Sequence, residues 1–183
     1  MSAYHGESRP DTQNSEAESA QTTHPRNEKL GTILLVEDDR NDMALIQRAF
    51  EREVANPIQH VENGVHATAY LMGTAISREL NYGDRCKYPV PILILLDLKM
   101  PQMGGLELLR WLRLQRDLKR IPVIVLTESV DSSSINAAYE LGANSYLIKP
   151  GKREDILRLV KSIGDYWLTL NESPHLILRA EVA

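Results

Sequence analysis

The sequence contains a single cysteine, Cys86, so no disulfide can form within the chain. A chain without disulfides fits a reducing compartment, and we expect a cytoplasmic protein. The five histidines are scattered, and with only one cysteine they give no spacing typical of a zinc site. No apolar run approaches the roughly 18 residues of a membrane-spanning helix. The N-terminus also lacks the basic segment followed by an apolar one that marks a secretory signal.

Loops that cradle phosphate groups are also missing. No two glycines stand as Gly-x-Gly, and no Gly-Lys-Ser or Gly-Lys-Thr occurs, which argues against a nucleotide or flavin binder. The net charge is low, because 21 Lys and Arg residues against 25 Asp and Glu residues leave -4. A mildly acidic chain is a poor general binder of nucleic acids or membrane surfaces, so we expect neither DNA nor a membrane as partner.

The two ends of the chain differ from its middle. Residues 1–30 contain no Ile, Val, Phe or Trp and are rich in Ser, Glu, Gln, Asn and Thr. Such a segment cannot bury enough apolar surface to offset chain entropy, so we predict a disordered N-terminal tail over residues 1–30. The apolar patterns of a globular domain extend over residues 31–168. Residues 169–183 are too few for a DNA-binding output module, and we expect a C-terminal extension that is a candidate dimer arm.

Apolar runs of strand length alternate with stretches of helical spacing from Thr32 onward. Three of the runs are continuously aliphatic, which is typical of parallel strands covered by helices on both faces. The strict alternation of five strand–helix units predicts an α/β doubly wound domain. Residues 73–90 form a long polar connection, and we expect part of it to extend the helix before it. The five expected strands are Thr32–Val36, Ile58–Val61, Pro91–Leu96, Pro122–Leu126 and Ser145–Ile148.

Acidic, hydroxyl or ammonium side chains follow four of these five runs. In an open parallel sheet, functional groups gather at the carboxyl ends of the strands. Each residue also has a structural explanation: Asp39 or Asn41 would cap the following helix, Thr127 could end a strand or cap a helix, and Lys149 could belong to a plain turn. One cap per helix suffices, however, so capping does not explain the whole acidic cluster. The residues at the strand ends are Glu37, Asp38, Asp39, Asp97, Thr127, Glu128 and Lys149.

These residue types together suit one kind of chemistry. Crowded carboxylates repel one another and raise each other's pKa values, unless a cation lies among them. Mg²⁺ prefers oxygen ligands and commonly takes one or two carboxylates together with a phosphate. With the cation present, a carboxylate can attack phosphorus and form an aspartyl phosphate. An ammonium group and a hydroxyl group then neutralise charge on the transferring phosphoryl group.

The same residues lie in motifs that resemble the receiver domain of bacterial two-component response regulators. The motifs are Thr32–Asp38, Leu95–Gly105, Val125–Thr127 and Tyr146–Pro150, within a resemblance that covers about residues 32–168. The resemblance implies a flavodoxin-like five-stranded parallel sheet of order 2-1-3-4-5 with helices on both faces. It also implies a regulator that catalyses its own phosphorylation and dephosphorylation, not a conventional enzyme.

Specific roles follow from the resemblance. Asp97 would accept a phosphoryl group from a sensor histidine kinase. Asp38, Asp97 and the backbone carbonyl of Lys99 would bind Mg²⁺ directly, and Glu37 would act through water. Lys149 would pair with the phosphoryl oxygens, and Thr127 would donate a hydrogen bond to them. Tyr146 would swing inward as Thr127 moves, and Pro150 follows a peptide bond that is typically cis in the family.

Three further segments are similar to stand-alone receivers linked to bacterial and cyanobacterial phytochromes: Tyr82–Pro91, Ala143–Pro150 and Tyr166–Asn171. This likeness implies a bacteriophytochrome as the kinase and a homodimer made through the C-terminal segment. The last helix carries two apolar stripes. Ile156, Val160, Ile163 and Trp167 should face the sheet, whereas Leu159, Tyr166 and Leu170 should meet water or a partner, followed by a further apolar cluster, Leu176–Leu178.

Other functions deserve comparison. Haloacid-dehalogenase-like phosphatases also use an aspartyl nucleophile, but they need Asp-x-Asp, and Lys99 stands at the second position. A phosphate sink, an intermediate in a phosphorelay and a degenerate receiver that only binds partners are further alternatives. The presence of Asp97, Thr127 and Lys149 argues against the degenerate receiver. Glu128 is an unusual neighbour, because its carboxylate could repel phosphoryl donors, slow hydrolysis of the phosphate, or both.

Overall fold

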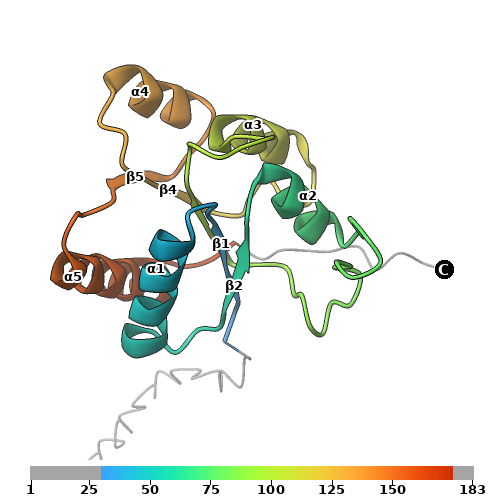
Figure 1. The fold of residues 1–183 in the computed structure, drawn as a ribbon, viewed down its shortest axis with the longest axis horizontal. Coiled ribbons are helices and arrows are strands. Elements are labelled where there is room, and N and C mark those ends of the chain that lie inside the picture. Colours follow the sequence, from blue (N-terminus) through green and yellow to red (C-terminus); the bar gives the residue numbers. More distant parts are fainter. Residues whose placement is uncertain (1–29, 175–183) are drawn as a thin grey trace, which may run out of the picture.

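The computed structural model describes residues 30–174, which form a five-stranded parallel sheet with strand order β2-β1-β3-β4-β5 (Figure 1). This order and the strict alternation with helices confirm the predicted fold. The strands are β1 (Ile33–Val36), β2 (Ile58–Val61), β3 (Leu93–Leu96), β4 (Val123–Thr127) and β5 (Ser145–Ile148). The helices are α1 (Arg40–Glu53), α2 (Gly64–Met72), α3 (Gly105–Leu114), α4 (Ser132–Glu140) and α5 (Arg153–Ile163), and α5 continues as a π-helical segment, η1 (Gly164–Leu170).

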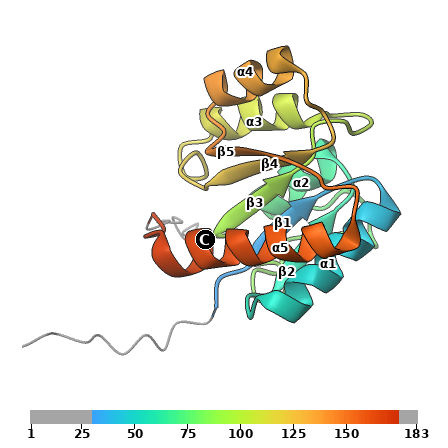
Figure 2. The same cartoon turned by 90° about the vertical axis from the view of Figure 1, so that its left-hand side faces the viewer.

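The sheet separates two apolar cores. On one face α1 and α5 lie side by side, and on the other α2, α3 and α4 cover the strands (Figure 2). Alternate residues of β1 enter the two cores: Ile33 and Leu35 pack with α1 and α5, and Leu34 and Val36 pack with α2 and α3. All four residues of β1 are therefore buried, which explains why the central strands are continuously aliphatic.

The connection after α2 does not extend that helix. Gly73 ends it in the left-handed conformation, with φ of 70°, and its backbone N–H returns to carbonyls of the last turn. The Arg85 guanidinium donates to the carbonyls of Tyr70 and Leu71 at 2.8 and 2.7 Å, so the connection folds back over the helix end. The expected extension of α2 is therefore wrong, because a glycine cap and an arginine satisfy the end of the helix.

The apolar stripes of α5 are only partly as predicted. Val160 and Ile163 are buried and Trp167 packs against the same core, whereas Tyr166 and Leu170 are 54% and 73% exposed. Leu159 also packs against this core, which differs from its expected exposure. The reason is that α5 packs against α1 as well as the sheet, so its buried face is broader than one stripe.

The predicted disordered tail over residues 1–30 lies outside the described residues except for Leu30, and so does the apolar cluster Leu176–Leu178. Across residues 30–174, no helix combines the length and the apolar character that crossing a membrane requires.

Candidate phosphoryl-acceptor site

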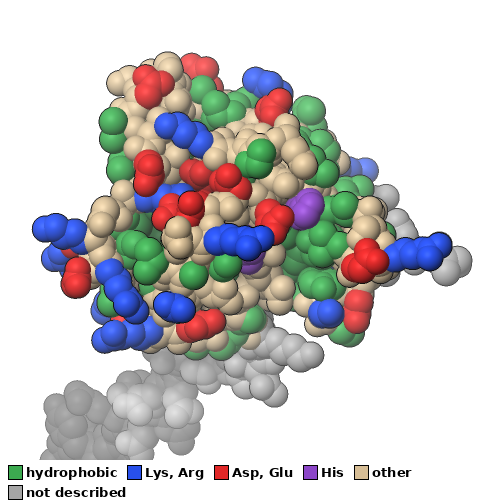
Figure 3. Space-filling view, viewed as in Figure 1, with side chains coloured by type: hydrophobic (Ala, Val, Ile, Leu, Met, Phe, Trp, Pro, Cys, Tyr) green, Lys and Arg blue, Asp and Glu red, His purple; other side chains and the backbone are tan. Residues whose placement is uncertain are grey.

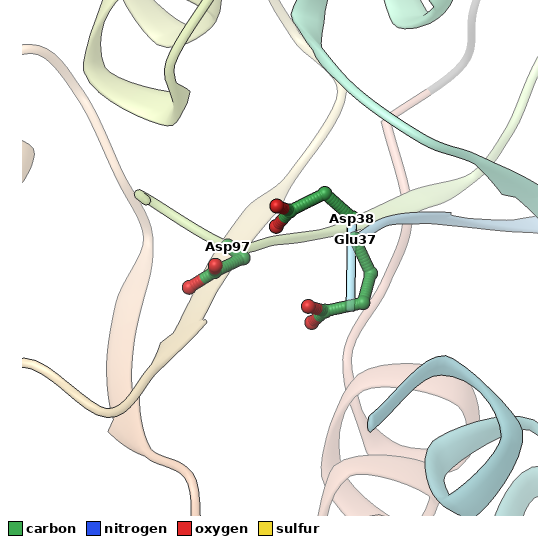
Figure 4. Close-up of side chains that lie close together, drawn as sticks. All are labelled: Glu37, Asp38 and Asp97. Atoms are coloured by element: carbon green, nitrogen blue, oxygen red, sulfur yellow. The ribbon is translucent and has the colours of Figure 1, made fainter. Parts of the chain in front are cut away.

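Three carboxylates converge at the carboxyl ends of β1 and β3 (Figure 4). Glu37 and Asp38 follow β1, and Asp97 follows β3; one carboxylate oxygen from each lies within 4.8 Å of those of the other two. Glu37 and Asp97 are 1% and 6% exposed, whereas Asp38 is open to solvent. Figure 3 shows acidic side chains grouped near the middle of this face of the molecule. The sequence-predicted acidic cluster is therefore brought together.

Local backbone contacts set the positions of these carboxylates. Asp39 is the N-cap of α1, and its carboxylate accepts hydrogen bonds from the N–H groups of Asn41 and Asp42. The capping role thus belongs to Asp39 rather than Asn41, which leaves Glu37 and Asp38 free for the site. The Nε2 atom of His60, on β2, lies 2.7 Å from the backbone carbonyl oxygen of Glu37, at hydrogen-bond distance. Sequence reasoning missed this histidine, because its relation to Glu37 depends on strand pairing.

The loop after Asp97 requires a close backbone approach. A Cβ atom on Gly105 would lie 2.2 Å from the carbonyl oxygen of Asp97, so only glycine allows α3 to begin against this loop. The N–H of Gly105 donates to the carbonyl of Leu98 at 3.1 Å. Lys99 lies exposed in this loop, where its backbone carbonyl follows Asp97 by two residues.

Lys149 reaches the cluster from the end of β5. Its Nζ atom lies 2.6 Å from Glu37 Oε2, 2.7 Å from Asp42 Oδ2 and 3.9 Å from Asp97 Oδ1. Burial alone would lower the pKa of this ammonium, but the Asp42 and Glu37 carboxylates outweigh burial and raise it. Asp42 was not among the sequence-predicted site residues; its place in the first turn after the acidic cluster was the only available signal.

Glu37 has the environment expected of a cation ligand. Burial raises the pKa of its carboxyl from the ordinary 4.5 to about 7, although Lys149 acts in the opposite direction. The contact with Lys149 is an ion pair whose angles are not those of a hydrogen bond, and Glu37 Oε2 accepts no hydrogen bond from any residue that the structure describes. A buried oxygen without a hydrogen bond, beside two further carboxylates, fits a hard divalent cation.

Thr127 and Tyr146 border the site from β4 and β5. Thr127 is 1% exposed and is the last residue of β4, and its hydroxyl oxygen accepts a long hydrogen bond of 3.4 Å from the N–H of Ser129. Asp131 caps α4, so the helix-cap explanation of Thr127 is wrong. The Tyr146 hydroxyl donates to the carbonyl of Ser129 at 3.0 Å, which ties this ring to the loop between β4 and α4.

Two features beside Lys149 complete the site. The Lys149–Pro150 peptide bond is trans, in contrast to the cis bond implied by the family resemblance, since no peptide bond between described residues is cis. Glu128 is exposed and lines a cavity of about 170 Å³ between α1 and α5, together with Asp42 and Lys149. Glu128 and Lys149 therefore border the same cavity.

Two known proteins are similar in sequence to most of this chain. FilR2, named a probable methanogenesis regulatory protein, of Methanothrix harundinacea, is 41% identical over 143 residues, which are 78% of this chain and 86% of FilR2. The response regulator Rcp1 of Synechocystis is 36% identical over 137 residues, which are 74% of this chain and 88% of Rcp1.

Solved structures are similar over nearly their whole length. The phosphorylated cyanobacterial phytochrome response regulator RcpA has a TM-score of 0.72 and 34% identity, covering 80% of this chain and 99% of RcpA. The Mn²⁺-bound form of Rcp1 has a TM-score of 0.68 and 35% identity, covering 79% of this chain and 99% of that chain. The family model for the response regulator receiver domain matches residues 33–161. The chain thus belongs to the response regulator receiver domain family, and it is a regulator of two-component signalling rather than a conventional enzyme.

Proposed function

We propose that Asp97 accepts a phosphoryl group from a sensor histidine kinase in a reaction that depends on Mg²⁺. The observation that carries this proposal is the position of Asp97: a buried carboxylate at a strand end, within reach of two other carboxylates and facing a lysine. The phosphorylated state of the relative RcpA and the Mn²⁺-bound state of Rcp1 support it. Incubation with acetyl phosphate, followed by intact-mass measurement with Mg²⁺ or with EDTA, tests the proposal.

Each residue has a distinct task in the proposed reaction. A carboxylate oxygen of Asp97 forms a bond to phosphorus while the bond from phosphorus to the leaving atom of the donor breaks. Asp38, Asp97 and the Lys99 carbonyl are the proposed direct ligands of Mg²⁺, and Glu37 is the proposed outer ligand. When bound, Mg²⁺ supplies positive charge that offsets the carboxylates and the phosphoryl oxygens. Lys149 donates to a phosphoryl oxygen, because its ammonium already lies at the edge of Asp97.

The proposed switch links Thr127 to Tyr146. A phosphoryl group on Asp97 would draw the Thr127 hydroxyl toward it, and the Ser129 segment that Thr127 and Tyr146 both contact would shift with it. The exposed surface of α4 and β5 would then report the state of Asp97. Tyr139 and Ile148, on these two elements, are 50% and 41% exposed and would be the reporting side chains.

Replacing Thr127 with Val is expected to leave phosphoryl uptake possible but to reduce the conformational response. Valine keeps the buried volume and removes the hydroxyl that would bind the phosphoryl group. The measurement is the NMR spectrum of wild type and Thr127→Val protein with and without beryllofluoride. Thr169→Val, which removes a hydroxyl from η1, is the control. A wild-type response of the α4–β5 resonances in Thr127→Val would show that the hydroxyl has no switching role.

We further propose a phytochrome kinase as the phosphoryl donor and a homodimer formed through residues 169–183 and the end of α5. The similarity to RcpA supports the first part, because RcpA is a cyanobacterial phytochrome response regulator. FilR2 is named for methanogenesis, so a sensor kinase other than a phytochrome is the alternative donor. The direct test compares the rates of phosphotransfer to this protein from a purified phytochrome kinase and from a purified sensor kinase that is not a phytochrome. The exposed Tyr166 and Leu170 side chains support the second part.

Replacing both Tyr166 and Leu170 with Ala is expected to convert a dimer into a monomer, because these exposed apolar side chains would form the centre of the interface. Sedimentation of the full chain at tens of micromolar is the measurement, with and without acetyl phosphate. Leu114→Ala provides the control, because Leu114 is 78% exposed and lies at the end of α3. A full chain that sediments as a monomer in both states would overturn this part of the proposal.

A further inference from the structure

Asp42 contacts Lys149 and does not make the contact usual for its position in the helix. It occupies the third position of α1, where an acidic side chain commonly reaches back to the N–H of the capping residue. Here the N–H of Asp39 donates to Glu37 Oε1 instead, at 3.2 Å. The Asp42 carboxylate turns toward the site, and its Oδ2 atom lies 2.7 Å from Lys149 Nζ. This contact joins two segments that are 107 residues apart in the chain.

Lys149 is thereby shared among three carboxylates. An ammonium group has three N–H donors in a fixed tetrahedral arrangement. Asp42 accepts one of these hydrogen bonds at 2.7 Å, Glu37 Oε2 lies in ion-pair contact at 2.6 Å, and Asp97 Oδ1 lies at 3.9 Å, beyond hydrogen-bond distance. The ammonium therefore keeps N–H donors for a group attached to Asp97.

The Glu37 carboxylate has two competing partners, a bound cation and the Lys149 ammonium. It belongs to the group of three carboxylates that could hold a cation, and it is also a partner of Lys149. A cation that draws on the Glu37 carboxylate weakens its hold on Lys149. Asp42 does not belong to the three-carboxylate group, so its hold on Lys149 does not depend on the cation.

A cavity beside Lys149 offers space for a second position of its side chain. A cavity of about 170 Å³ lies between α1 and α5, and Asp42 and Lys149 both line it. The Lys149 side chain is only 10% exposed, yet its flexible stem could move into this space once the Asp42 contact is removed.

From these contacts we propose that Asp42 is a positioning residue, which keeps the Lys149 ammonium directed at Asp97 while the cation engages Glu37. This inference rests on the proposed phosphoryl transfer to Asp97. According to this inference, the first turn of α1 affects the rate of that transfer because it positions Lys149, and not because it binds the metal.

The test uses the full chain and acetyl phosphate at saturating Mg²⁺, with the rate of labelling followed by intact mass. Asp42→Asn is expected to lower this rate about tenfold, as for other losses of orientation at a reacting group. The half-saturating Mg²⁺ concentration should stay within about twofold of wild type, because Asp42 is not a cation ligand in this assignment. Asp42→Glu, which keeps the charge on a longer side chain, should recover part of the rate.

The control and the alternative outcomes separate this inference from the proposed function. Glu51→Gln removes one exposed negative charge farther along α1 and should label at the wild-type rate. Asp42→Ser repeats the measurement in case Asp42→Asn does not fold. Labelling of Asp42→Asn and Asp42→Ser at the wild-type rate, or a rate loss matched by an equal change in the Mg²⁺ requirement, would overturn the positioning role alone. A wild-type protein that takes up no phosphoryl group would overturn the proposed function and this inference together.

Discussion

Asp97→Asn protein is expected to gain no phosphate mass after incubation with acetyl phosphate and Mg²⁺, whereas the wild-type protein gains one phosphoryl group. The asparagine side chain has nearly the same shape as aspartate but offers an amide oxygen, which is a far weaker nucleophile toward phosphorus. Asp97 is 6% exposed and lies against Glu37, Asp38 and Lys149, so the substitution changes the chemistry of the site without emptying it. The expected effect is complete loss of labelling, which intact-mass measurement detects directly.

Two controls make this result specific to the site. Asp117→Asn changes an exposed carboxylate in the connection before β4, at the opposite end of the strands, and should label like wild type. EDTA should suppress labelling of the wild-type protein, because three neighbouring carboxylates repel an anionic phosphoryl donor unless a cation offsets their charge. A phosphate adduct that persists in Asp97→Asn would place the acceptor elsewhere, and labelling that survives EDTA would remove the proposed role of Mg²⁺.

The free energy of unfolding is expected to fall by about 3 kcal/mol between pH 4.5 and pH 8 when no divalent cation is present. The Glu37 carboxyl has a pKa of about 7 in the folded protein, raised from 4.5 by burial. Between these values the folded state binds more protons than the unfolded state, so stability decreases as the pH rises. Each pKa unit corresponds to about 1.4 kcal/mol, which gives the expected size of the change. Urea unfolding in EDTA at pH 4.5 and pH 8 measures it.

Substitutions and Mg²⁺ assign this pH dependence to Glu37. Glu37→Gln should lose most of it, because glutamine does not titrate, and Glu51→Gln should retain it, because Glu51 is exposed. Mg²⁺ should stabilise the wild-type protein more at pH 8 than at pH 5, since protons and the cation compete for the same carboxylates. An unchanged pH dependence in Glu37→Gln would show that the buried carboxyl does not titrate in this range.

Local pattern in the sequence determined most of the fold. Continuous aliphatic runs indicated strands buried on both faces, and β1, β3 and β4 are buried along their whole length. Polar residues directly after these runs indicated a site at the carboxyl ends of the strands, and Glu37, Asp38 and Asp97 do meet there. These predictions succeed because the side-chain period of a strand and the ends of parallel strands are set by neighbouring residues and by chain direction.

Elements whose ends depend on distant side chains were predicted less well. The connection after α2 was expected to extend the helix, but Gly73 and the Arg85 guanidinium end it at Met72. Leu159 was assigned to an exposed stripe, yet it packs into the core because α5 also contacts α1. Periodicity along one helix carries no information about a second helix beside it.

The sequence by itself determined which chemical groups this protein brings to the ends of its strands, because these groups come at the ends of apolar runs of strand length. Only the tertiary structure decided how those groups share their charges. The contact of Asp42 with Lys149, the hold of His60 on the Glu37 carbonyl and the raised pKa of Glu37 all require segments far apart in the chain to pack together. Distances of this kind depend on the pairing of β2 with β1 and on how the start of α1 meets the residue after β5, and no local pattern of residues encodes that packing.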